Sequence, residues 1–352
     1  MTQALQEAQA ELGATFAERG AMQIPISFGN DEAARQAAQR GVAVYDASHW
    51  GRILVSDSDR LRFLHNQSTN AFEQRQPGEG CDTVFVTPTA RTIDLTTAYI
   101  LEDAVLLLVS PDKDKDLIKW MDRFIFFADK VKLENQTPTT TTFRLIGPES
   151  EALVNRLGID PLKDQPYGTH QLVSLNGIEV RIAVGSGLAI AGYTLITQIE
   201  HAATVWKSLA SLGAVPLGEQ AWNQLRVIQG RPVPGQELTE DYNPLEAGLW
   251  STISFQKGCY IGQETIARLQ TYRGVKQQLW GIQLPTIVEP GSVITSGEDK
   301  IGKLTSCVAV SEGYVGLAYI RTKAIELAQT QVEVEGVAGS LVALPFVSHE
   351  YP

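Results

Sequence analysis

One cysteine of this chain stands among residues that suit thiol chemistry. Residues 257–264 read KGCYIGQE, so Cys259 lies between Gly258 and Gly262 and two positions after Lys257, where a helix is expected to begin. A thiol close to a helix N-terminus and to a lysine loses its proton more readily than a free cysteine does. A small, buried and inert side chain is the alternative, because free cysteine is among the most buried residue types. The octet alone is compatible with both interpretations.

Two charged residues in apolar surroundings are candidates for ligand binding. Asp94 interrupts the apolar and threonine-rich run 92–96. Its carboxylate must be paired, solvated at a pocket wall or shifted in pKa, unless it lies on the exposed face of a half-buried strand. Arg226 is expected on a helix beside Leu225 and Ile228. It is either a surface arginine or a clamp for the anionic end of a ligand.

Other motifs argue against several kinds of site. Gly185-Ser186-Gly187 indicates a hairpin turn and does not complete a dinucleotide fingerprint, because Ile190 replaces the third glycine and no helix is expected to follow. The five histidines lack the short spacing of zinc ligands, so we expect no metal site. The three cysteines form no Cys-x-x-Cys pair. Their number is odd for a disulfide framework and too small for an iron–sulfur cluster held by this chain alone.

The composition is that of an ordinary globular protein, with 43% hydrophobic and 20% charged residues among 352. This length predicts about two or three domains. The net charge of −11 argues against a general nucleic-acid or anionic-membrane binder. The N-terminal residues contain no apolar signal segment, and apolar runs such as 104–109 are too short to cross a bilayer. The cytoplasm is therefore the expected location.

Hydrophobic spacing predicts the elements that must position these residues. The chain is expected to begin with an amphipathic helix that carries Leu5, Leu12 and Phe16 on one face. Strands are then expected at 81–86, 93–101, 104–109 and 130–133, with a helix at 112–127, which together favour a split αβ layer. Further helices are expected at 150–157, 201–212 and 219–228. After Lys276, short strands with close turns, the last at 341–346, predict a small β-barrel or sandwich.

The octet around Cys259 closely resembles the signature of the YgfZ family of folate-binding proteins. Other segments are similar to that family and follow in the expected order. They are residues 41–46, 63–70, 226–232 and 243–246 before the octet, and Arg268, Tyr272, Arg273 and Gly274 after it. The resemblance covers nearly the whole chain. The wider superfamily includes the T-protein of glycine cleavage, which is an aminomethyltransferase.

The resemblance implies an α+β fold, in which three domains form a cloverleaf around a central folate cavity. It implies a first, split domain made of residues 1–50 plus 141–217. The second domain, which is ferredoxin-like, would contain residues 51–140 plus 218–275. A C-terminal β-barrel would contain residues 276–352.

The same resemblance implies a cofactor, tetrahydrofolate or a one-carbon derivative of it, and a set of site residues. The folate-binding residues that it implies are Asp94, Arg226, Tyr193, Gly258 and Gly262. In this set Asp94 would bind pterin-side nitrogens and Arg226 a glutamate carboxylate. Cys259 and Lys257 are the implied catalytic residues.

YgfZ relatives support the making or repair of iron–sulfur proteins, including an enzyme that modifies tRNA. The resemblance therefore implies a folate-dependent accessory protein whose partners are iron–sulfur client enzymes or assembly machinery, with no direct contact to nucleic acid and no membrane. Aminomethyl transfer in glycine cleavage is the first alternative. Against it, Leu95 replaces the second acid of the T-protein's acidic pair, and that protein's Gly-Glu-Asp-Gly turn has no clear counterpart near 192–194. A thiol-redox protein without folate, the second alternative, would need Cys259 but neither Asp94 nor Arg226.

Overall fold

A computed structural model describes residues 2–20, 22–160, 162–327 and 330–351. Contacts within the chain divide it into two compact units. The first unit contains Met1–Leu64, Phe72–Asp82 and Thr96–Trp222, and the second contains His65–Ala71, Thr83–Leu95 and Asn223–Pro352. Each unit is therefore built from segments that are far apart in the sequence. The three domain boundaries implied above stay a prediction.

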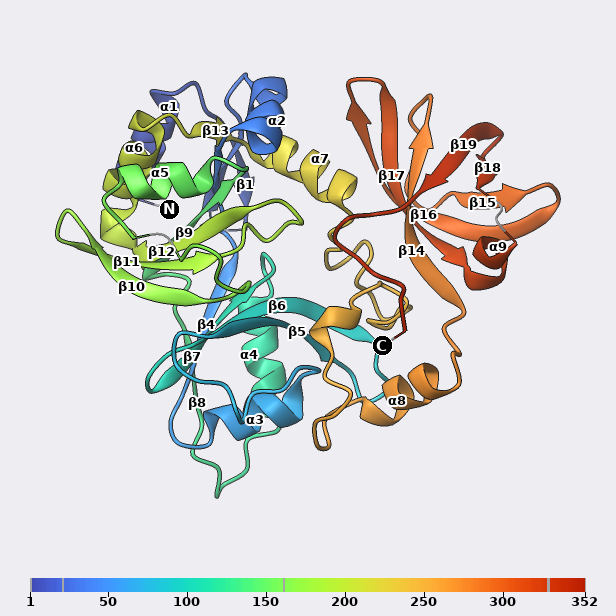
Figure 1. Cartoon of the computed structure of the whole chain (residues 1–352), viewed down its shortest axis with the longest axis horizontal. Coiled ribbons are helices and arrows are strands. Elements are labelled where there is room, and N and C mark those ends of the chain that lie inside the picture. The colour runs from blue at the N-terminus through green and yellow to red at the C-terminus, as the bar shows by residue number, and fades with distance from the viewer. Residues whose placement is uncertain (1, 21, 161, 328–329, 352) are drawn as a thin grey trace. The chain divides into compact units, whose positions relative to one another are not determined.

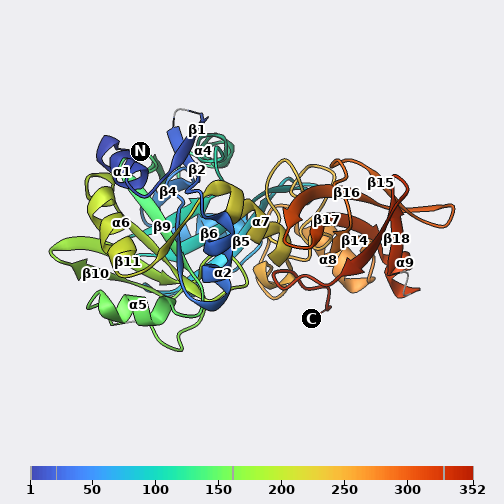
Figure 2. The ribbon, with the colours of Figure 1, turned by 90° about the horizontal axis from the view of Figure 1, so that it is seen from above.

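The first unit contains a six-stranded sheet in the order β10-β11-β12-β9-β3-β13 (Figure 1). The strands are β3 Ala43–Asp46, β9 Thr140–Ile146, β10 His170–Leu175, β11 Ile178–Val184, β12 Gly192–Gln198 and β13 Val215–Leu217. Helices α1 (Gln3–Ala10) and α6 (Ala202–Ser211) pack together (Figure 2). They share a core with the sheet and with α5 (Ser150–Arg156), in which Phe143, Leu195 and Trp206 are fully buried. Trp206 stacks on Phe28.

The N-terminal segment differs from the expected single helix. Helix α1 ends at Ala10, and the chain turns at Gly13, whose φ of +89° is a left-handed conformation that glycine adopts without strain. Phe16, which was expected on the helix, lies instead in β1 (Thr15–Arg19), and β1 pairs with β2 (Met22–Ser27). Helix α2 (Asp31–Arg40) follows. The glycine, rather than the apolar spacing, decides where the helix stops.

A five-stranded sheet has the order β5-β6-β7-β4-β8. Its strands are β4 Gly51–Ser56, β5 Gly80–Val86, β6 Thr92–Ile100, β7 Ala104–Val109 and β8 Lys132–Asn135, and its helices are α3 (Arg60–Gln67) and α4 (Asp114–Asp122). The expected strands are confirmed. Helix α4 is shorter than the expected 112–127, because it is capped at Arg123. After the cap the chain forms a turn, in which the backbone N–H of Phe126 donates to the Asp129 carboxylate at 2.8 Å. Strands β5 and β6 each run from one unit into the other.

The C-terminal region of the second unit is a closed barrel in the order β14-β17-β16-β15-β18-β19 (Figure 1, orange to red). The strands are β14 Gln277–Leu284, β15 Val293–Ser296, β16 Asp299–Val310, β17 Gly313–Arg321, β18 Gln331–Val334 and β19 Val337–Val342, with α9 at Thr322–Glu326. Apolar side chains such as Ile282, Ile294 and Ile320 fill it. The last strand lies a few residues before the expected 341–346. The predicted small β domain is thus a barrel and not a sandwich.

The remaining elements of the described residues are α7 (Glu219–Gln229), α8 (Gln263–Thr271) and two short 3₁₀ turns, η1 (Ile199–His201) and η2 (Trp250–Thr252). The expected helices at 219–228 and after the octet are confirmed. The α+β fold class, with ferredoxin-like sheets and a C-terminal barrel, is also confirmed. Within the described residues, no helix has the length and apolar character that crossing a membrane requires.

Candidate functional site around the Cys259 loop

The loop that carries the cysteine, residues 257–262 and here called the Cys259 loop, ends at a glycine that no other residue can replace without strain. Gly262 is the N-cap of α8 with φ +81°. A Cβ atom at this position would lie 2.9 Å from Val86 Cγ2 and 3.0 Å from the carbonyl oxygen of Thr87. The backbone of the loop therefore sits directly against the turn that joins β5 to β6.

Lys257 fastens the other end of the Cys259 loop. Its ammonium donates hydrogen bonds to the backbone carbonyls of His65, Ser68 (2.6 Å) and Asn70 (2.7 Å), and it lies 4.4 Å from the centre of the Tyr260 ring. An ammonium group has three N–H donors, and here three carbonyls receive them. This geometry favours a structural role for Lys257 over the catalytic role implied by the resemblance.

The segment 65–71 links the Cys259 loop to the β5–β6 hairpin. The backbone N–H of Ile261 binds the carbonyl of Asn66 at 3.0 Å. On the hairpin side, the N–H of Thr69 binds the carbonyl of Val84 at 3.1 Å, and the Thr69 hydroxyl donates to the carbonyl of Thr252 at 2.8 Å. Backbone bonds of this kind hold three separate stretches of the second unit in a fixed register.

Cys259 is exposed, whereas Cys81 is buried and Cys307 is intermediate. The interpretation of Cys259 as an inert core residue is therefore wrong. Gly258 is exposed as well, and a Cβ there would meet nothing closer than His65 Nε2 at 4.0 Å. The thiol thus lies in solvent on a loop whose two ends are fixed, and of its two glycines only Gly262 is forced by close packing.

Tyr260 anchors the middle of the loop. It is buried in an apolar cluster with Ala90, Trp250 and Ile266, the last of which lies on α8. Burial raises the pKa of Tyr260 to about 12, so the phenol stays neutral over the physiological range. The adjacent side chains of Cys259 and Tyr260 therefore lie in opposite environments, the thiol in solvent and the ring in the core.

Asp94 lies in β6, close to the turn that contacts Gly262. The turn is closed by a hydrogen bond from Thr87 N to Arg91 O at 2.9 Å and by another from Arg91 N to the Thr87 hydroxyl at 3.0 Å. Asp94 itself is fully buried, so its interpretation as a carboxylate on an exposed strand face is wrong. A carboxylate held away from water in this way is suited to accept N–H hydrogen bonds.

Arg226 is not available to a ligand in this geometry. Its guanidinium, on α7, forms an ion pair with Glu237 at 2.9 Å, and the two side chains are 1% and 0% exposed. The guanidinium also donates to Asn223 Oδ1 (2.8 Å), Ser306 Oγ (3.0 Å) and the side-chain carbonyl of Gln236. The clamp role implied for Arg226 is therefore corrected to an internal one: the guanidinium ties α7 to the loop after it and to the barrel strand β16.

The segment 243–246, which resembles the YgfZ family, forms a turn that is closed by its own side chains. Asn243 Oδ1 accepts the N–H groups of Leu245 and Glu246, both at 3.0 Å, while Glu246 Oε2 accepts the N–H of Asn243 at 3.1 Å. This reciprocal pattern is a capping box, and its Asn-x-x-Glu spacing was visible in the sequence. Burial raises the pKa of Glu246.

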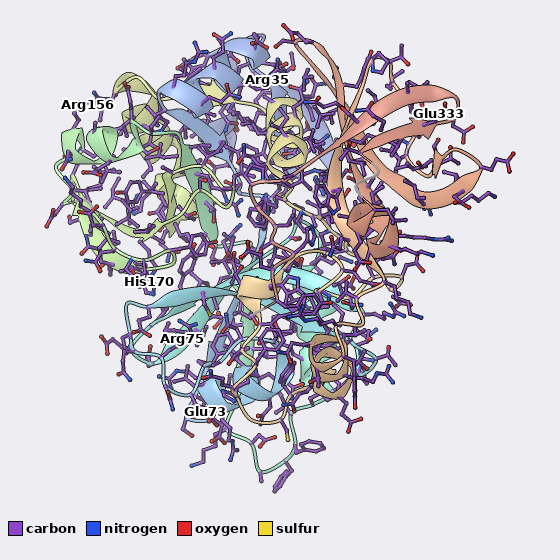
Figure 3. The ribbon with its side chains drawn as sticks, turned by 45° about the vertical axis from the view of Figure 1, so that its right-hand side comes forward. Arg35, Glu73, Arg75, Arg156, His170 and Glu333 are labelled. Carbon is purple, nitrogen blue, oxygen red and sulfur yellow. The ribbon has the colours of Figure 1, made fainter. Side chains whose placement is uncertain are left out.

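The histidines form no metal centre with the acidic residues: among the described residues, no group of three or more His, Cys, Asp or Glu side chains is placed to hold a metal ion. His170, labelled in Figure 3, is buried on β10, with Nδ1 2.9 Å from Nη1 of Arg181. Burial, together with the charge of Arg181, lowers the pKa of His170 to about 4. A neutral imidazole that accepts from arginine is a structural group here.

Tyr193 lies in the first unit, whereas the other implied site residues lie in the second. It is 6% exposed and lines a cavity of about 260 Å³ between α5 and the turn at 185–192. The structure thus brings Lys257, Gly258, Cys259 and Gly262 together on one loop, and it places Asp94 on β6, the strand that follows the turn contacted by Gly262.

The fold and the site define an aminomethyltransferase-like protein. The crystal structure of glycine cleavage system aminomethyltransferase T from Bartonella henselae superposes with a TM-score of 0.84 and 18% sequence identity, covering 100% of this chain and 99% of that one. At that identity the likeness concerns the fold alone. The model of the GCVT N-terminal domain family matches residues 5–257, and the chain belongs to this family.

Curated relatives are similar over nearly the whole chain. The Arabidopsis thaliana protein named "Putative transferase At1g60990, chloroplastic" is 47% identical over 328 residues, which cover 93% of this chain and 76% of that protein. The protein named "Aminomethyltransferase" of Bacillus subtilis (strain 168) is 27% identical over 336 residues, which cover 92% of each.

Proposed function

We propose that this chain is a folate-dependent accessory protein of the YgfZ type, which supports the assembly or repair of iron–sulfur enzymes through Cys259. The observation that carries the proposal is the exposure of the Cys259 thiol on a loop pinned by Lys257 and Gly262. A loop that is already ordered presents a nucleophilic or metal-binding sulfur to a partner without the entropy cost of ordering the loop on binding. Iron–sulfur client enzymes or assembly machinery are the partners we infer, and support of tRNA modification would be indirect.

Membership of the GCVT family supports a folate ligand, and the residues of this chain fit one in part. Asp94 has the right chemistry, because a buried carboxylate can accept the N–H groups of a pterin ring. Arg226 does not fit, because its side chain is buried and is bonded to Glu237, Asn223 and Ser306 within the fold. Tyr193 stays a prediction. A reduced folate, when bound, supplies a carrier for one-carbon units, while Asp94 orients it and the Cys259 loop presents the thiol.

Aminomethyl transfer is the second candidate, and the names and fold of the relatives favour it. The residue after Asp94 speaks against it. Leu95 is 1% exposed and packs in the core with Val84, Val86 and Tyr242, so the second acid of the T-protein pair is replaced by a residue of the hydrophobic core. A thiol-redox protein without folate remains the third candidate. We propose the cytoplasm as the location of this protein, and the chloroplast, which the name of the plant relative gives, is the alternative.

Two experiments separate these functions. Calorimetry with tetrahydrofolate should show binding to the wild type and to Asp103→Asn, an exposed control, but much weaker binding to Asp94→Asn. In cells lacking the corresponding protein, the wild type and Cys307→Ser should restore iron–sulfur enzyme activity, and Cys259→Ser should not. Restoration by the Asp94→Asn variant without folate binding would support the thiol-redox candidate, and product formation from an aminomethylated lipoyl carrier and tetrahydrofolate would support aminomethyl transfer.

A further inference from the structure

Apart from the folate role predicted for Tyr193, the proposed function assigns no role to the cavity in the first unit. Its volume of about 260 Å³ is slightly below the range of about 300–1,000 Å³ typical of small-molecule sites, so its occupant would be small. Three stretches of chain line it: the start of α5, the loop that contains Leu162, Asp164 and Tyr167, and the turn from Val184 to Tyr193.

Gly185 shapes one wall of the cavity. A Cβ at this position would lie 2.4 Å from the ring of Tyr167, so the absence of a side chain lets that ring lie against the backbone. The Tyr167 hydroxyl is held by Asp82 at 2.9 Å. Ser186 fixes the turn, because its hydroxyl donates to the carbonyl of Ile190 at 2.6 Å and accepts the N–H of Leu188 at 3.2 Å. The Gly-Ser-Gly run thus forms a fixed turn that leaves room for the partly exposed Tyr167 ring, and it is not a phosphate loop.

Tyr193 contributes a polar group to the same cavity that the fold leaves unused. Tyr193 as a whole residue is only 6% exposed. No described residue forms a hydrogen bond with its hydroxyl. Burial raises the pKa of Tyr193, and the nearby carboxylates of Glu151 and Asp164 raise it further. The hydroxyl is open to the cavity and not enclosed in the core, so a ligand in the cavity can form a hydrogen bond with it.

The charge of the lining determines which ligands fit. Of the residues described in it, the charged ones are Glu151 and Asp164, both acidic, and apolar side chains such as Leu162 and Ile190 cover much of the rest. Two carboxylates disfavour an anion, and they favour a cation with N–H donors. The aromatic wall at Tyr167 adds a further surface that attracts cations.

We propose that this cavity binds a small organic cation, a primary ammonium group on a short apolar body. The ammonium pairs with Glu151 and Asp164 and donates to the Tyr193 hydroxyl, while the apolar body contacts Leu162 and Ile190. Lys163, which lies 3.9 Å from Glu151 in an exposed ion pair, competes with the ligand at the rim. The proposal does not depend on folate binding at Asp94, and it assigns Tyr193 to the ammonium ligand in place of the folate role predicted above. The acidic lining disfavours a folate's glutamate tail.

The test uses n-butylammonium as the probe, with 1-butanol as the neutral control and butyrate as the anionic one. Binding to the full chain is followed by ligand-observed NMR. We expect saturable millimolar binding of n-butylammonium, and about tenfold weaker binding of 1-butanol, as the loss of a charge-assisted contact predicts. Butyrate should not bind. Equal binding of the amine and the alcohol would overturn the proposal, and so would absence of saturable amine binding.

Variants locate the binding. Asp164→Asn and Tyr193→Phe should each weaken n-butylammonium several-fold, and Lys163→Ala should strengthen it. Asp160→Asn is the matched control, because it makes the same change on the adjoining loop outside the cavity lining and should leave affinity unchanged. Melting curves equal to wild type show that a variant is folded. If tetrahydrofolate displaces the amine and its own binding is lost in Tyr193→Phe, Tyr193 belongs to the folate site and the proposal is wrong.

Discussion

Lys257 is joined to Ser68, 189 positions earlier in the chain, by a 2.6 Å hydrogen bond from its ammonium to the backbone carbonyl. The same ammonium reaches the carbonyls of His65 and Asn70. A lysine that looks like a partner for the thiol in the sequence is, in three dimensions, a clamp that closes the Cys259 loop onto the 65–71 segment.

Removing this clamp should loosen the loop. Lys257→Met keeps the unbranched apolar part of the side chain and deletes its three donors. Because hydrogen bonds from charged groups contribute about 1.5–3 kcal/mol, we expect a loss of at least about 1.5 kcal/mol in the free energy of unfolding, measured with urea. Faster protease cleavage within 257–262 should accompany it. Unchanged stability together with unchanged cleavage would show that Lys257 is not a clamp.

The two glycines of the loop should respond differently to the same change. Gly262→Ala places a Cβ 2.9 Å from Val86 Cγ2 on a backbone with φ +81°, and we expect a cost of about 1–3 kcal/mol. Gly258→Ala meets open space and should change the free energy of unfolding by less than about 0.5 kcal/mol. Equal effects of the two substitutions would contradict this assignment of the loop packing.

The three cysteines should react with a thiol reagent in the order of their exposure. In the native protein Cys259 should be modified first, Cys307 more slowly and Cys81 last. Timed labelling followed by peptide mass spectrometry gives the order directly. Cys259→Ser should abolish the fast phase and leave the slower phases unchanged. A fast phase that survives in this variant would mean that another thiol is the accessible one.

The ion pair of Arg226 and Glu237 should matter for stability rather than for folate affinity. Arg226→Met leaves the Glu237 carboxylate buried without its partner, which costs about 3–5 kcal/mol. The double variant Arg226→Met, Glu237→Leu should regain part of this loss, because it removes both charges. The affinity of the folded variant for tetrahydrofolate should stay within about threefold of the wild-type value, which is a difference of about 0.6 kcal/mol in binding free energy. A large, selective loss of affinity would restore the ligand-clamp role.

Acid should destabilise the first unit through His170. Its pKa falls from the ordinary 6.5 to about 4 in the folded state, so the unfolded chain binds the proton more readily. The neutral form contributes its full stability above pH 6.5, and the contribution is lost as the pH falls from 6.5 to about 4. That difference in pKa corresponds to at most about 3.4 kcal/mol of stability. Urea unfolding at pH 7 and pH 5 should show a smaller change in His170→Gln than in the wild type.

The sequence predicted the elements better than the partners of the site residues. Apolar spacing was enough for the strands at 81–86 and 104–109 and for the helix at 219–228. The partners of Lys257 lie 187 to 192 positions away, and Ser306 lies 80 positions from Arg226, so neither role had a local signal. Long-range packing alone decides such roles.

Exposure was the second property that the sequence left open. The octet was compatible with a buried or an exposed Cys259, and the structure decides for exposure because Tyr260, the next residue, supplies the anchor in the core. Asp94 had the opposite outcome: strand alternation allowed a solvent-facing carboxylate, but Asp94 and all of β6 after it are buried. In both cases the exposure of the side chain is set by the elements that pack around it.

The division of the chain also has a consequence for the time course of folding. The 83–95 hairpin places Val84, Val86 and Leu95 in a core that is completed by Leu279 and Tyr319 of the barrel. A ribosome adds about 5–20 residues per second, so these apolar side chains are made on the order of ten seconds or more before their partners emerge. The newborn chain must therefore carry an incomplete apolar surface through most of its synthesis, when chaperones have the opportunity to bind it.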